Sequence, residues 1–324
     1  MNSLFIDKRG ISLRIDGNAL CIYEDKQRVN AIPLAPLKRI FLHSDVELSA
    51  RVLGKLGEWQ IGLVVLYGYT EKPVLLMPTY SKDASRRQQQ YQLSQNPHLA
   101  LSFAKQLVAQ KIQGHLHVIQ HVLPQKPSER RILTKTQQQL ESLLTGSLKT
   151  CHSVETLRGL EGAAAASYFE MLAHILPASL DFKGRNRRPP KDPFNVLLSL
   201  GYSLLHSEAV LALHAAGLDP YVGFYHVLEH GRESLACDLV EPLRHHIDLF
   251  CWQLISEQTL NARDFGYSDN ACQLNKAGRT RFYQAYEKCL TTLRKRMWHA
   301  MRDMGHLFDG KPFEFEAVLL SEME

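Results

Sequence analysis

The sequence predicts an α+β fold, with a small N-terminal β-sandwich-like domain over residues 1–80 and a larger all-α domain over residues 81–324. Three observations predict it. Segments in which apolar and polar residues alternate, separated by turn residues, dominate the first 80 positions. Beyond them, apolar residues recur at the 3.6-residue spacing of helices. The length of 324 residues is enough for about two domains.

The N-terminal part contains a predicted hairpin and three further predicted strands. Residues 11–15 alternate apolar and polar side chains, Asp16-Gly17-Asn18 has the residue types of a hairpin turn, and residues 19–23 return as the partner strand. The further strands are predicted at residues 39–42, 61–66 and 73–77. Between them, Ser44 and Glu47 have the spacing of a capping box, which predicts that a short helix begins there.

Long helices are predicted after a hinge at residues 79–83. Their apolar residues keep helical spacing, and Pro124 and Pro127 separate two of them. The helices are predicted at residues 88–122, 128–144, 155–169, 239–257 and 281–304, with a long apolar helix after Asn195 that ends at Ala216. The tail at residues 308–324 is expected to be peripheral.

The composition is that of an ordinary soluble protein, with 45% hydrophobic and 22% charged residues. No apolar run approaches the roughly 20 residues that a membrane span needs, and the N-terminus lacks the apolar core of a signal peptide. We therefore expect a cytoplasmic protein with no membrane partner. The six cysteines form no CxxC pair, which favours free thiols in a reducing compartment and disfavours a zinc ribbon. The formal net charge of +5 permits a polyanionic partner without requiring one.

Residues 217–244 concentrate the side chains that could carry chemistry. Gly217-Leu218-Asp219-Pro220 is a helix-breaking turn, and His226 follows in an aromatic run. Asp238 and Glu241 are three positions apart, which places both carboxylates on one face of a helix. One histidine and two carboxylates suit Mg²⁺ or Mn²⁺. The same residues could instead be a hydrogen-bonded core histidine and acidic residues that stabilise a helix N-terminus, and this segment alone leaves both readings open.

Glu161 is a third candidate ligand. It precedes Gly162 and four alanines, whose small side chains allow a helix or a ligand to approach closely. A tight helix contact explains the alanines, but packing does not explain a carboxylate at the start of such a segment. Arg158, one turn earlier, is a candidate ion-pair partner or phosphate contact.

A cluster of basic residues precedes the long apolar helix, in a proline-rich loop. It consists of Lys183, Arg185, Arg187, Arg188 and Lys191. Such a cluster is either a solvated surface or a loop that binds phosphates, since arginines bind phosphate oxygens bidentately. Asn195 and Tyr202 could reach the candidate site from the helix that follows, whereas His206 and His214 are expected to be structural.

Several short motifs follow one another between residues 155 and 245. They are Arg158-Gly159-Leu160-Glu161-Gly162, Ala164-Ala165, Tyr168-Phe169, Arg187-Arg188-Pro189-Pro190, Asp192-Pro193, Asn195-Val196-Leu197-Leu198-Ser199-Leu200-Gly201-Tyr202, Gly217-Leu218-Asp219-Pro220, Gly223-Phe224-Tyr225-His226 and Asp238-Leu239-Val240-Glu241-Pro242-Leu243-Arg244. Their order and spacing resemble the CRISPR-associated integrase and endonuclease family of spacer acquisition. The β-rich start and helical remainder also look like that family's two-domain layout.

The resemblance implies a metal-dependent enzyme whose catalytic domain is the helical one. Glu161, His226 and Glu241 would bind Mg²⁺ or Mn²⁺, with Asp238 as a nearby catalytic assistant or alternate ligand. The implied reaction is transesterification, in which the 3′-hydroxyl of a DNA fragment attacks a strand of the CRISPR repeat. The DNA backbone would be bound by Arg158, Lys183, Arg185, Arg187, Arg188, Lys191 and Arg244.

The resemblance also implies partners: double-stranded DNA, both as fragment and as repeat, and a homodimer whose contacts lie in the N-terminal domain. Two dimers would be joined by a small CRISPR-associated adaptation partner. Two alternatives remain at this point. One is a structure-selective, metal-dependent nuclease that acts on branched DNA, and the other is a DNA-binding scaffold without enzymatic activity.

Overall fold

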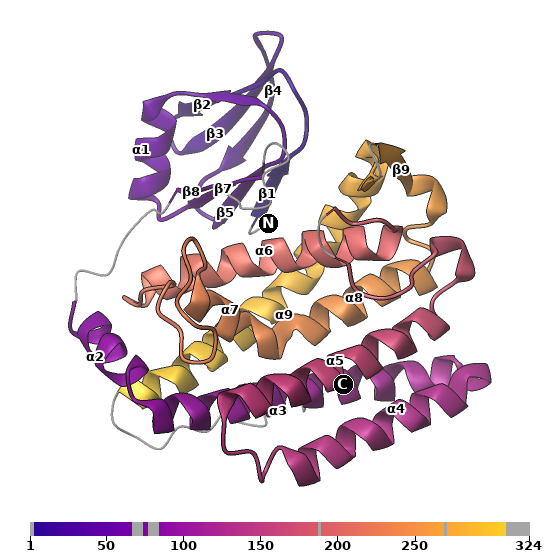
Figure 1. Ribbon diagram of the computed structural model, residues 1–324. Helices are drawn as coiled ribbons and strands as arrows, with labels where there is room; N and C mark the ends of the chain where they lie inside the picture. The colour runs from indigo at the N-terminus through magenta and orange to yellow at the C-terminus, as the bar shows by residue number, and fades with distance from the viewer. Residues whose placement is uncertain (1–2, 67–73, 77–83, 187–188, 269–270, 309–324) are drawn as a thin grey trace.

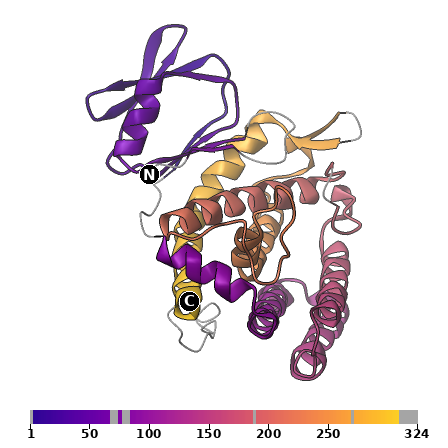
Figure 2. The ribbon, with the colours of Figure 1, turned by 60° about the vertical axis from the view of Figure 1, so that its left-hand side comes forward.

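The structure is a computed structural model that describes residues 3–66, 74–76, 84–186, 189–268 and 271–308 (Figure 1). The β-rich part lies at one end of the molecule and the helices at the other (Figures 1 and 2). This arrangement confirms the predicted fold class, a β-sandwich-like part followed by a mostly helical part. The predicted hinge at residues 79–83 and the tail beyond residue 308 lie outside the described residues.

Two four-stranded sheets build the β-rich part. The elements are β1 (Ser3–Ile6), β2 (Ile11–Asp16), β3 (Ala19–Glu24), β4 (Gln27–Pro33), β5 (Arg39–Leu42), β6 (Val46–Leu48), α1 (Ala50–Glu58), β7 (Gly62–Val65) and β8 (Val74–Leu76). The strand orders are β4-β3-β2-β6 and β1-β5-β7-β8. Buried aliphatic side chains from both sheets and α1, among them Leu13, Ile40 and Leu56, form one shared core.

β2 and β3 form the predicted hairpin, with Asp16 opposite Ala19 and Gly17 at a positive φ in the turn. The capping box predicted at Ser44 and Glu47 is wrong. Glu47 lies in β6, which pairs in parallel with β2, and α1 begins only after Ser49. β1 and β4 were not predicted. β1 is apolar but only four residues long, too short for a periodic pattern, and β4 is mostly exposed and lacks one.

The helical part contains eight helices among the described residues. They are α2 (Ser85–Ser94), α3 (Pro97–Val122), α4 (Arg130–Ser142), α5 (Val154–Ile175), α6 (Pro193–Ala215), α7 (Ser234–Val240), α8 (Arg244–Ser256) and α9 (Lys276–Phe308). Short 3₁₀ or π turns are η1 (Leu123–Gln125), η2 (Pro127–Glu129), η3 (Leu143–Ser147), η4 (Ala178–Leu180), η5 (Glu241–Leu243) and η6 (Ala262–Asp264), and β9 (Phe265–Ser268) pairs with β10 (Ala271–Leu274). α3 contacts α4, α5, α8 and η5, so it lies at the centre of this part.

Two predicted helices are divided in the structure. The helix predicted at residues 88–122 breaks at Asn96, whose side chain accepts hydrogen bonds from the first backbone N–H groups of α3, and Pro97 begins that helix. The helix predicted at residues 239–257 begins earlier, at Ser234, and is interrupted at η5. Pro242 has no N–H to donate, which explains the interruption.

α6 is long and apolar enough to cross a membrane by length and composition, so the expectation that no apolar run approaches that length does not hold for this helix. In this structure 67% of its most apolar window is buried. Its buried positions include the polar residues Asn195 and Glu208, which have partners inside the protein. α6 therefore serves as the core helix against which α7 and α8 pack.

Ion pairs and hydrogen bonds join the β-rich part to α6 and α9. Arg294 on α9 pairs with Glu208 on α6 at 2.6 Å, and Arg39 on β5 lies 3.5 Å from the same glutamate. Arg279 at the start of α9 pairs with Asp7 at 2.6 Å. Glu208 is almost fully buried and is shared by Arg39 and Arg294, so its loss would leave both arginines without this partner.

Candidate active site

Two of the predicted metal ligands meet at one lysine. Glu161 lies in the first half of α5, and Glu241 begins η5 between α7 and α8. The ammonium nitrogen of Lys111, on α3, is 2.5 Å from Glu161 Oε1 and 2.8 Å from Glu241 Oε2. Lys111 therefore bridges the two carboxylates, and three elements that are distant in the sequence contribute to one site.

Asp238 on α7 holds the loop that carries the third predicted ligand, His226. Its Oδ2 accepts hydrogen bonds from the backbone N–H groups of Phe224 at 2.7 Å and Tyr225 at 3.1 Å, and its Oδ1 accepts one from that of His226 at 3.0 Å. Gly223 permits this close approach, because a Cβ at that position would lie 2.7 Å from Asp238 Oδ2. The Gly-Phe-Tyr-His segment thus wraps around a fully buried carboxylate.

The same carboxylate orients the imidazole of His226. Nδ1 of His226 lies 2.6 Å from Asp238 Oδ1. An ionised carboxylate only accepts hydrogen bonds, so Nδ1 carries a proton, and in the neutral ring Nε2 presents its lone pair to a ligand. Both oxygens of Asp238 are engaged in these hydrogen bonds, which favours the role of assistant over that of alternate metal ligand, and both roles stay predictions.

Glu241 stays ionised although it is buried. Burial favours the neutral acid, but Arg244 and Lys111 outweigh that effect and hold the pKa of Glu241 well below its ordinary value, with His226 acting in the same direction. Glu241 Oε1 lies 2.9 Å from Arg244 Nε. Oε2 is buried, and its partner is the ammonium of Lys111 at 2.8 Å, so this oxygen faces a cation.

Glu161 is held by a tyrosine as well as by Lys111. The hydroxyl of Tyr225 donates a hydrogen bond to Glu161 Oε2, and burial together with this bond raises the pKa of Tyr225. Arg158 is exposed and acts electrostatically on the same hydroxyl. The ion pair predicted between Arg158 and Glu161 is replaced by the pair between Lys111 and Glu161, which leaves Arg158 facing solvent beside the site.

A buried layer beneath the site supports Arg244. The guanidinium carbon of Arg244 lies 4.8 Å from the centre of the Tyr202 ring. The Tyr202 hydroxyl donates a hydrogen bond to Asp248, and the Tyr168 hydroxyl donates another at 3.1 Å. Burial raises the pKa of Asp248 to about 6. Tyr202, predicted to reach the site, therefore contributes from below by positioning Arg244.

The basic loop is partly structural. Arg185 donates hydrogen bonds to Asn195 Oδ1 at 2.7 Å and to Ser199 Oγ at 3.1 Å. Asn195 is fully buried and also binds the loop backbone at Gly184 and Asn186, so it organises the loop and does not reach the site. Arg187 and Arg188 lie outside the described residues, and Lys191 is exposed. Lys183 pairs with Asp181 on the surface at 3.0 Å.

The sequence matches the family described as CRISPR associated protein Cas1 over residues 4–288. The chain belongs to the Cas1 family. Cas1 proteins form the endonuclease and integrase family of CRISPR adaptation, so the family resemblance drawn from the motifs is confirmed.

Similar Cas1 sequences cover nearly the whole chain. A protein of Thermodesulfovibrio yellowstonii named CRISPR-associated endonuclease Cas1 1 is 37% identical over 290 residues, which span 89% of this chain and 91% of that protein. CRISPR-associated endonuclease Cas1 3 of Thermus thermophilus is 30% identical over 322 residues, 99% of this chain and 89% of that protein.

Solved structures share the fold. A Cas1 protein from Thermotoga maritima has a TM-score of 0.80 at 22% identity, over 96% of this chain and 98% of that chain. A casposase bound to an integration product has a TM-score of 0.82 at 22% identity, over 100% of this chain and 95% of that chain. At these identities the likeness establishes the fold of the Cas1 chain, and the site rests on its own residues.

Sequence analysis missed Lys111, which is central to this Cas1 site. α3 buries Leu107, Val108, Ile112 and His115 on one face, and Lys111 occupies a position of that face. A charged residue where helical spacing predicts an apolar one is a detectable signal, because an ammonium on a buried face needs a partner. Its partners, however, come from α5 and η5, which local spacing does not reveal.

The donor set of this Cas1 site fits a divalent metal ion. Two carboxylates and one imidazole nitrogen suit Mg²⁺ or Mn²⁺, and the buried Glu241 Oε2 already faces a cation, the ammonium of Lys111 at 2.8 Å. Within the part of the chain that the structure describes, no three His, Cys, Asp or Glu side chains are gathered in a metal-binding geometry. The cation that Glu161 and Glu241 share here is the ammonium of Lys111.

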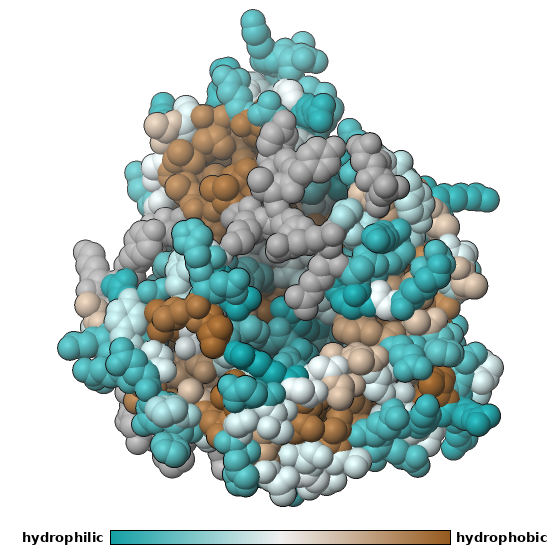
Figure 3. All heavy atoms as spheres, viewed as in Figure 1, coloured by the Kyte–Doolittle hydropathy of each residue, from teal (hydrophilic) through white to brown (hydrophobic). Residues whose placement is uncertain are grey.

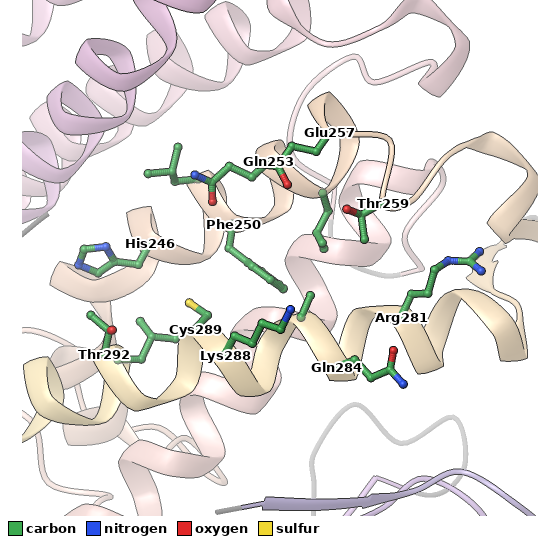
Figure 4. A pocket seen from close by; sticks show the side chains of 14 residues that line it. His246, Phe250, Gln253, Glu257, Thr259, Arg281, Gln284, Lys288, Cys289 and Thr292 are labelled. Atoms are coloured by element: carbon green, nitrogen blue, oxygen red, sulfur yellow. The ribbon is translucent and has the colours of Figure 1, made fainter. Parts of the chain in front are cut away.

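A pocket elsewhere in the Cas1 fold contains none of these residues. It has a volume of about 710 Å³ and lies between α8 and α9 (Figure 4). Phe250 and Leu254 are among its apolar lining residues, and Arg281 and Lys288 are among its basic ones. His206, predicted to be structural, pairs with Glu233 at 2.8 Å, also outside the site.

Proposed function

We propose that this chain is a metal-dependent DNA integrase of CRISPR adaptation, which joins the 3′-hydroxyl ends of DNA fragments to the repeat. One observation carries the proposal: Glu161 and Glu241 converge on a single cation position, beside a histidine whose ring is oriented by Asp238. Glu161, His226 and Glu241 would hold Mg²⁺ or Mn²⁺ there. When bound, the ion supplies Lewis acidity toward a phosphodiester oxygen.

The residues of the chain prepare this site in four ways. Glu241 is ionised at any neutral pH because of its basic neighbours. His226 presents Nε2 because Asp238 holds Nδ1. The Tyr225 hydroxyl fixes one oxygen of Glu161 and leaves the other facing the cation position. Burial of Asp238 and Glu241 limits water at the site, which strengthens these electrostatic interactions.

The reaction exchanges one phosphodiester for another. The fragment's 3′-oxygen attacks phosphorus, forms the new bond and loses its proton, while the repeat's 3′-oxygen leaves and takes up a proton. Arg158 is exposed beside Tyr225, where it can bind a DNA phosphate. Arg244 is bound to Glu241 and stacked on Tyr202, so it orients the Glu241 carboxylate. The Arg244 side chain is 22% exposed, which leaves part of it accessible to a phosphate.

The proposed partners are double-stranded DNA, a second copy of the chain and a small adaptation protein that joins two dimers. Solved structures of similar fold include a Cas6-RT-Cas1–Cas2 complex and a Cas1–DNA complex. A dimer contact in the β-rich part is supported by a hydrophobic patch on one side of it in Figure 3, and by β8, which exposes Val74 and Leu76 at a sheet edge. A cytoplasmic location belongs to the same proposal.

A reconstituted integration assay tests this function. It combines the purified chain, a duplex with 3′-hydroxyl ends, a supercoiled plasmid that carries the repeat, the small adaptation partner, and Mn²⁺, Mg²⁺ or EDTA. We expect covalently joined product that needs the metal and disappears in Glu161→Gln, while Glu155→Gln on the same helix retains it.

Other outcomes identify the alternatives. Nicked plasmid with no joined product would replace the integrase with a nuclease, the activity for which the Cas1 relatives are named. Shifted DNA with no chemistry under either metal would replace both with a DNA-binding scaffold.

A further inference from the structure

Lys111 stands where the proposed function places a metal ion. Its ammonium contacts Glu161 Oε1 and Glu241 Oε2, one oxygen from each predicted carboxylate ligand. Two facing carboxylates repel each other unless a cation lies between them, so this ammonium stabilises the site without metal. Lys111 is consequently more than a neighbour of the site, because it is bound to the atoms that a metal would need.

Lys111 and a divalent ion compete for the same lone pairs. Glu241 Oε2 is buried, and the ammonium of Lys111 lies 2.8 Å from it. Mg²⁺ binds carboxylate oxygens at about 2.0–2.1 Å, so an ion bound to these two oxygens would lie next to the ammonium. Two cations at that separation repel strongly where water is scarce.

The charge balance of the site points the same way. By formal charge, Lys111 and Arg244 offset Glu161 and Glu241, and Asp238 adds one further negative charge beside His226. Addition of a divalent ion leaves an excess of positive charge unless Lys111 finds another anionic partner. A DNA phosphate at the mouth of the site is such a partner, because the Lys111 side chain is 16% exposed and its flexible stem can redirect the ammonium.

We propose that Lys111 competes with the metal ion for Glu161 and Glu241. When DNA binds, the ammonium of Lys111 moves from these carboxylates to a DNA phosphate, so that metal binding and DNA binding favour each other. This inference rests on the proposed metal site. It makes Lys111 a positioning residue that suppresses metal loading in the absence of DNA. By linkage, DNA must raise the affinity for the metal by the same factor as the metal raises the affinity for DNA.

Mn²⁺ binding, followed by the electron paramagnetic resonance signal of free Mn²⁺, tests the competition without any catalytic readout. We expect Lys111→Met, which keeps the stem and removes the charge, to bind Mn²⁺ at least about fivefold more tightly than the wild type without DNA. A short duplex should tighten Mn²⁺ binding by the wild type and have little effect on the variant. Lys105→Met, on the same helix but bonded to the Lys149 carbonyl, is the matched control.

The outcomes separate this inference from the proposed function. If Glu161→Gln leaves Mn²⁺ binding unchanged, the proposed metal site itself is wrong. If Glu161→Gln weakens binding but Lys111→Met binds Mn²⁺ no more tightly than the wild type, or keeps the full effect of DNA, only the competition is wrong.

A labelling experiment on the wild-type chain needs no variant to fold. An amine-reactive acetylating reagent followed by mass spectrometry reports how exposed each lysine is. We expect saturating Mn²⁺ alone to increase the labelling of Lys111. Saturating Mn²⁺ together with a duplex that lacks reactive ends should change the labelling of Lys111 and leave that of Lys105 unchanged. Labelling of Lys111 that stays constant up to saturating Mn²⁺ would overturn the proposal.

Discussion

At the scale of single residues, Asp238 shows how one buried side chain can determine a site without facing the substrate. It accepts three backbone hydrogen bonds from the 224–226 segment and one from the His226 ring. A carboxylate that orients a ligand histidine typically contributes about 10- to 100-fold to metal affinity or activity. The catalytic role predicted for Asp238 is thus best understood as orientation of His226.

We predict that Asp238→Asn lowers Mn²⁺ affinity and strand transfer by roughly 10- to 100-fold, because an amide binds the His226 ring less strongly and allows the other tautomer. Circular dichroism should show an unchanged helix content. Asp248→Asn, which alters a buried carboxyl of the layer below, is the control and should affect Mn²⁺ affinity less. An Asp238→Asn protein with wild-type Mn²⁺ affinity would contradict the orienting role.

The residues of the site were predictable from the sequence to different degrees. Glu161, His226, Asp238 and Glu241 occur in short motifs whose order is distinctive, and the structure joins Glu161 to Glu241 through Lys111 and His226 to Asp238. Lys111 was missed because its role depends on two distant carboxylates. Asn195 and Tyr202 were candidates to reach the site, yet side-chain direction on a buried helix depends on packing. In the structure Asn195 organises the basic loop, and Tyr202 packs under Arg244.

At the scale of secondary structure, α3 and α8 pack closely enough to require glycine. A Cβ at Gly114 would lie 2.3 Å from Nδ1 and 2.6 Å from Cγ of His245. Gly114 is one turn beyond Lys111 on α3, and His245 is one turn beyond Glu241. This contact therefore fixes the distance between the two elements that bring Lys111 and Glu241 together.

We predict that Gly114→Ala lowers the free energy of unfolding by about 1–3 kcal/mol, the usual cost of overpacking. Gly159→Ala is the matched control, because it is also helical and a Cβ there meets nothing within 4 Å. That variant should be neutral or more stable by up to about 1 kcal/mol, since alanine favours helix more than glycine does. Equal effects of the two variants in urea denaturation would show that the α3–α8 contact is not tight.

Elements were predicted well where their pattern is local and poorly where it depends on pairing. The β2–β3 hairpin and the apolar helix α6 carry clear periodicity, and both are present. Strand β6 was taken for the start of a helix, because its partner β2 is far away in the sequence. The breaks before α3 and at η5 lie at Pro97 and Pro242, which local rules could have identified.

At the scale of the whole molecule, buried histidines between α3 and α8 make stability depend on pH. Burial holds the pKa of His115 and His246 well below the ordinary value and lowers that of His245 to about 3. Below about pH 6.5 the unfolded chain takes up these protons and the folded chain does not, so stability falls as the pH falls. Asp248, whose pKa burial raises to about 6, opposes this with one proton between about pH 4 and 6.

We predict that the free energy of unfolding decreases between pH 6 and 5 by about 3 kcal/mol, which corresponds to a net difference of two protons at about 1.4 kcal/mol each. Urea denaturation at several pH values measures this slope. His245→Asn should reduce the slope by about one proton, whatever its effect on stability at pH 7.5. A stability that is constant from pH 7 to pH 5 would mean that these histidines take up protons in the folded protein.

We propose that Glu161, His226 and Glu241 bind one divalent ion where the ammonium of Lys111 now lies. Anomalous scattering at the manganese edge, from crystals of the chain soaked in Mn²⁺ with a bound DNA duplex, tests it most directly. We predict one strong peak in contact with both carboxylates and the Nε2 atom of His226, with the ammonium of Lys111 moved away toward a phosphate. A manganese peak in contact with Asp238 instead, or no peak and Lys111 still between the two carboxylates, would contradict this metal site.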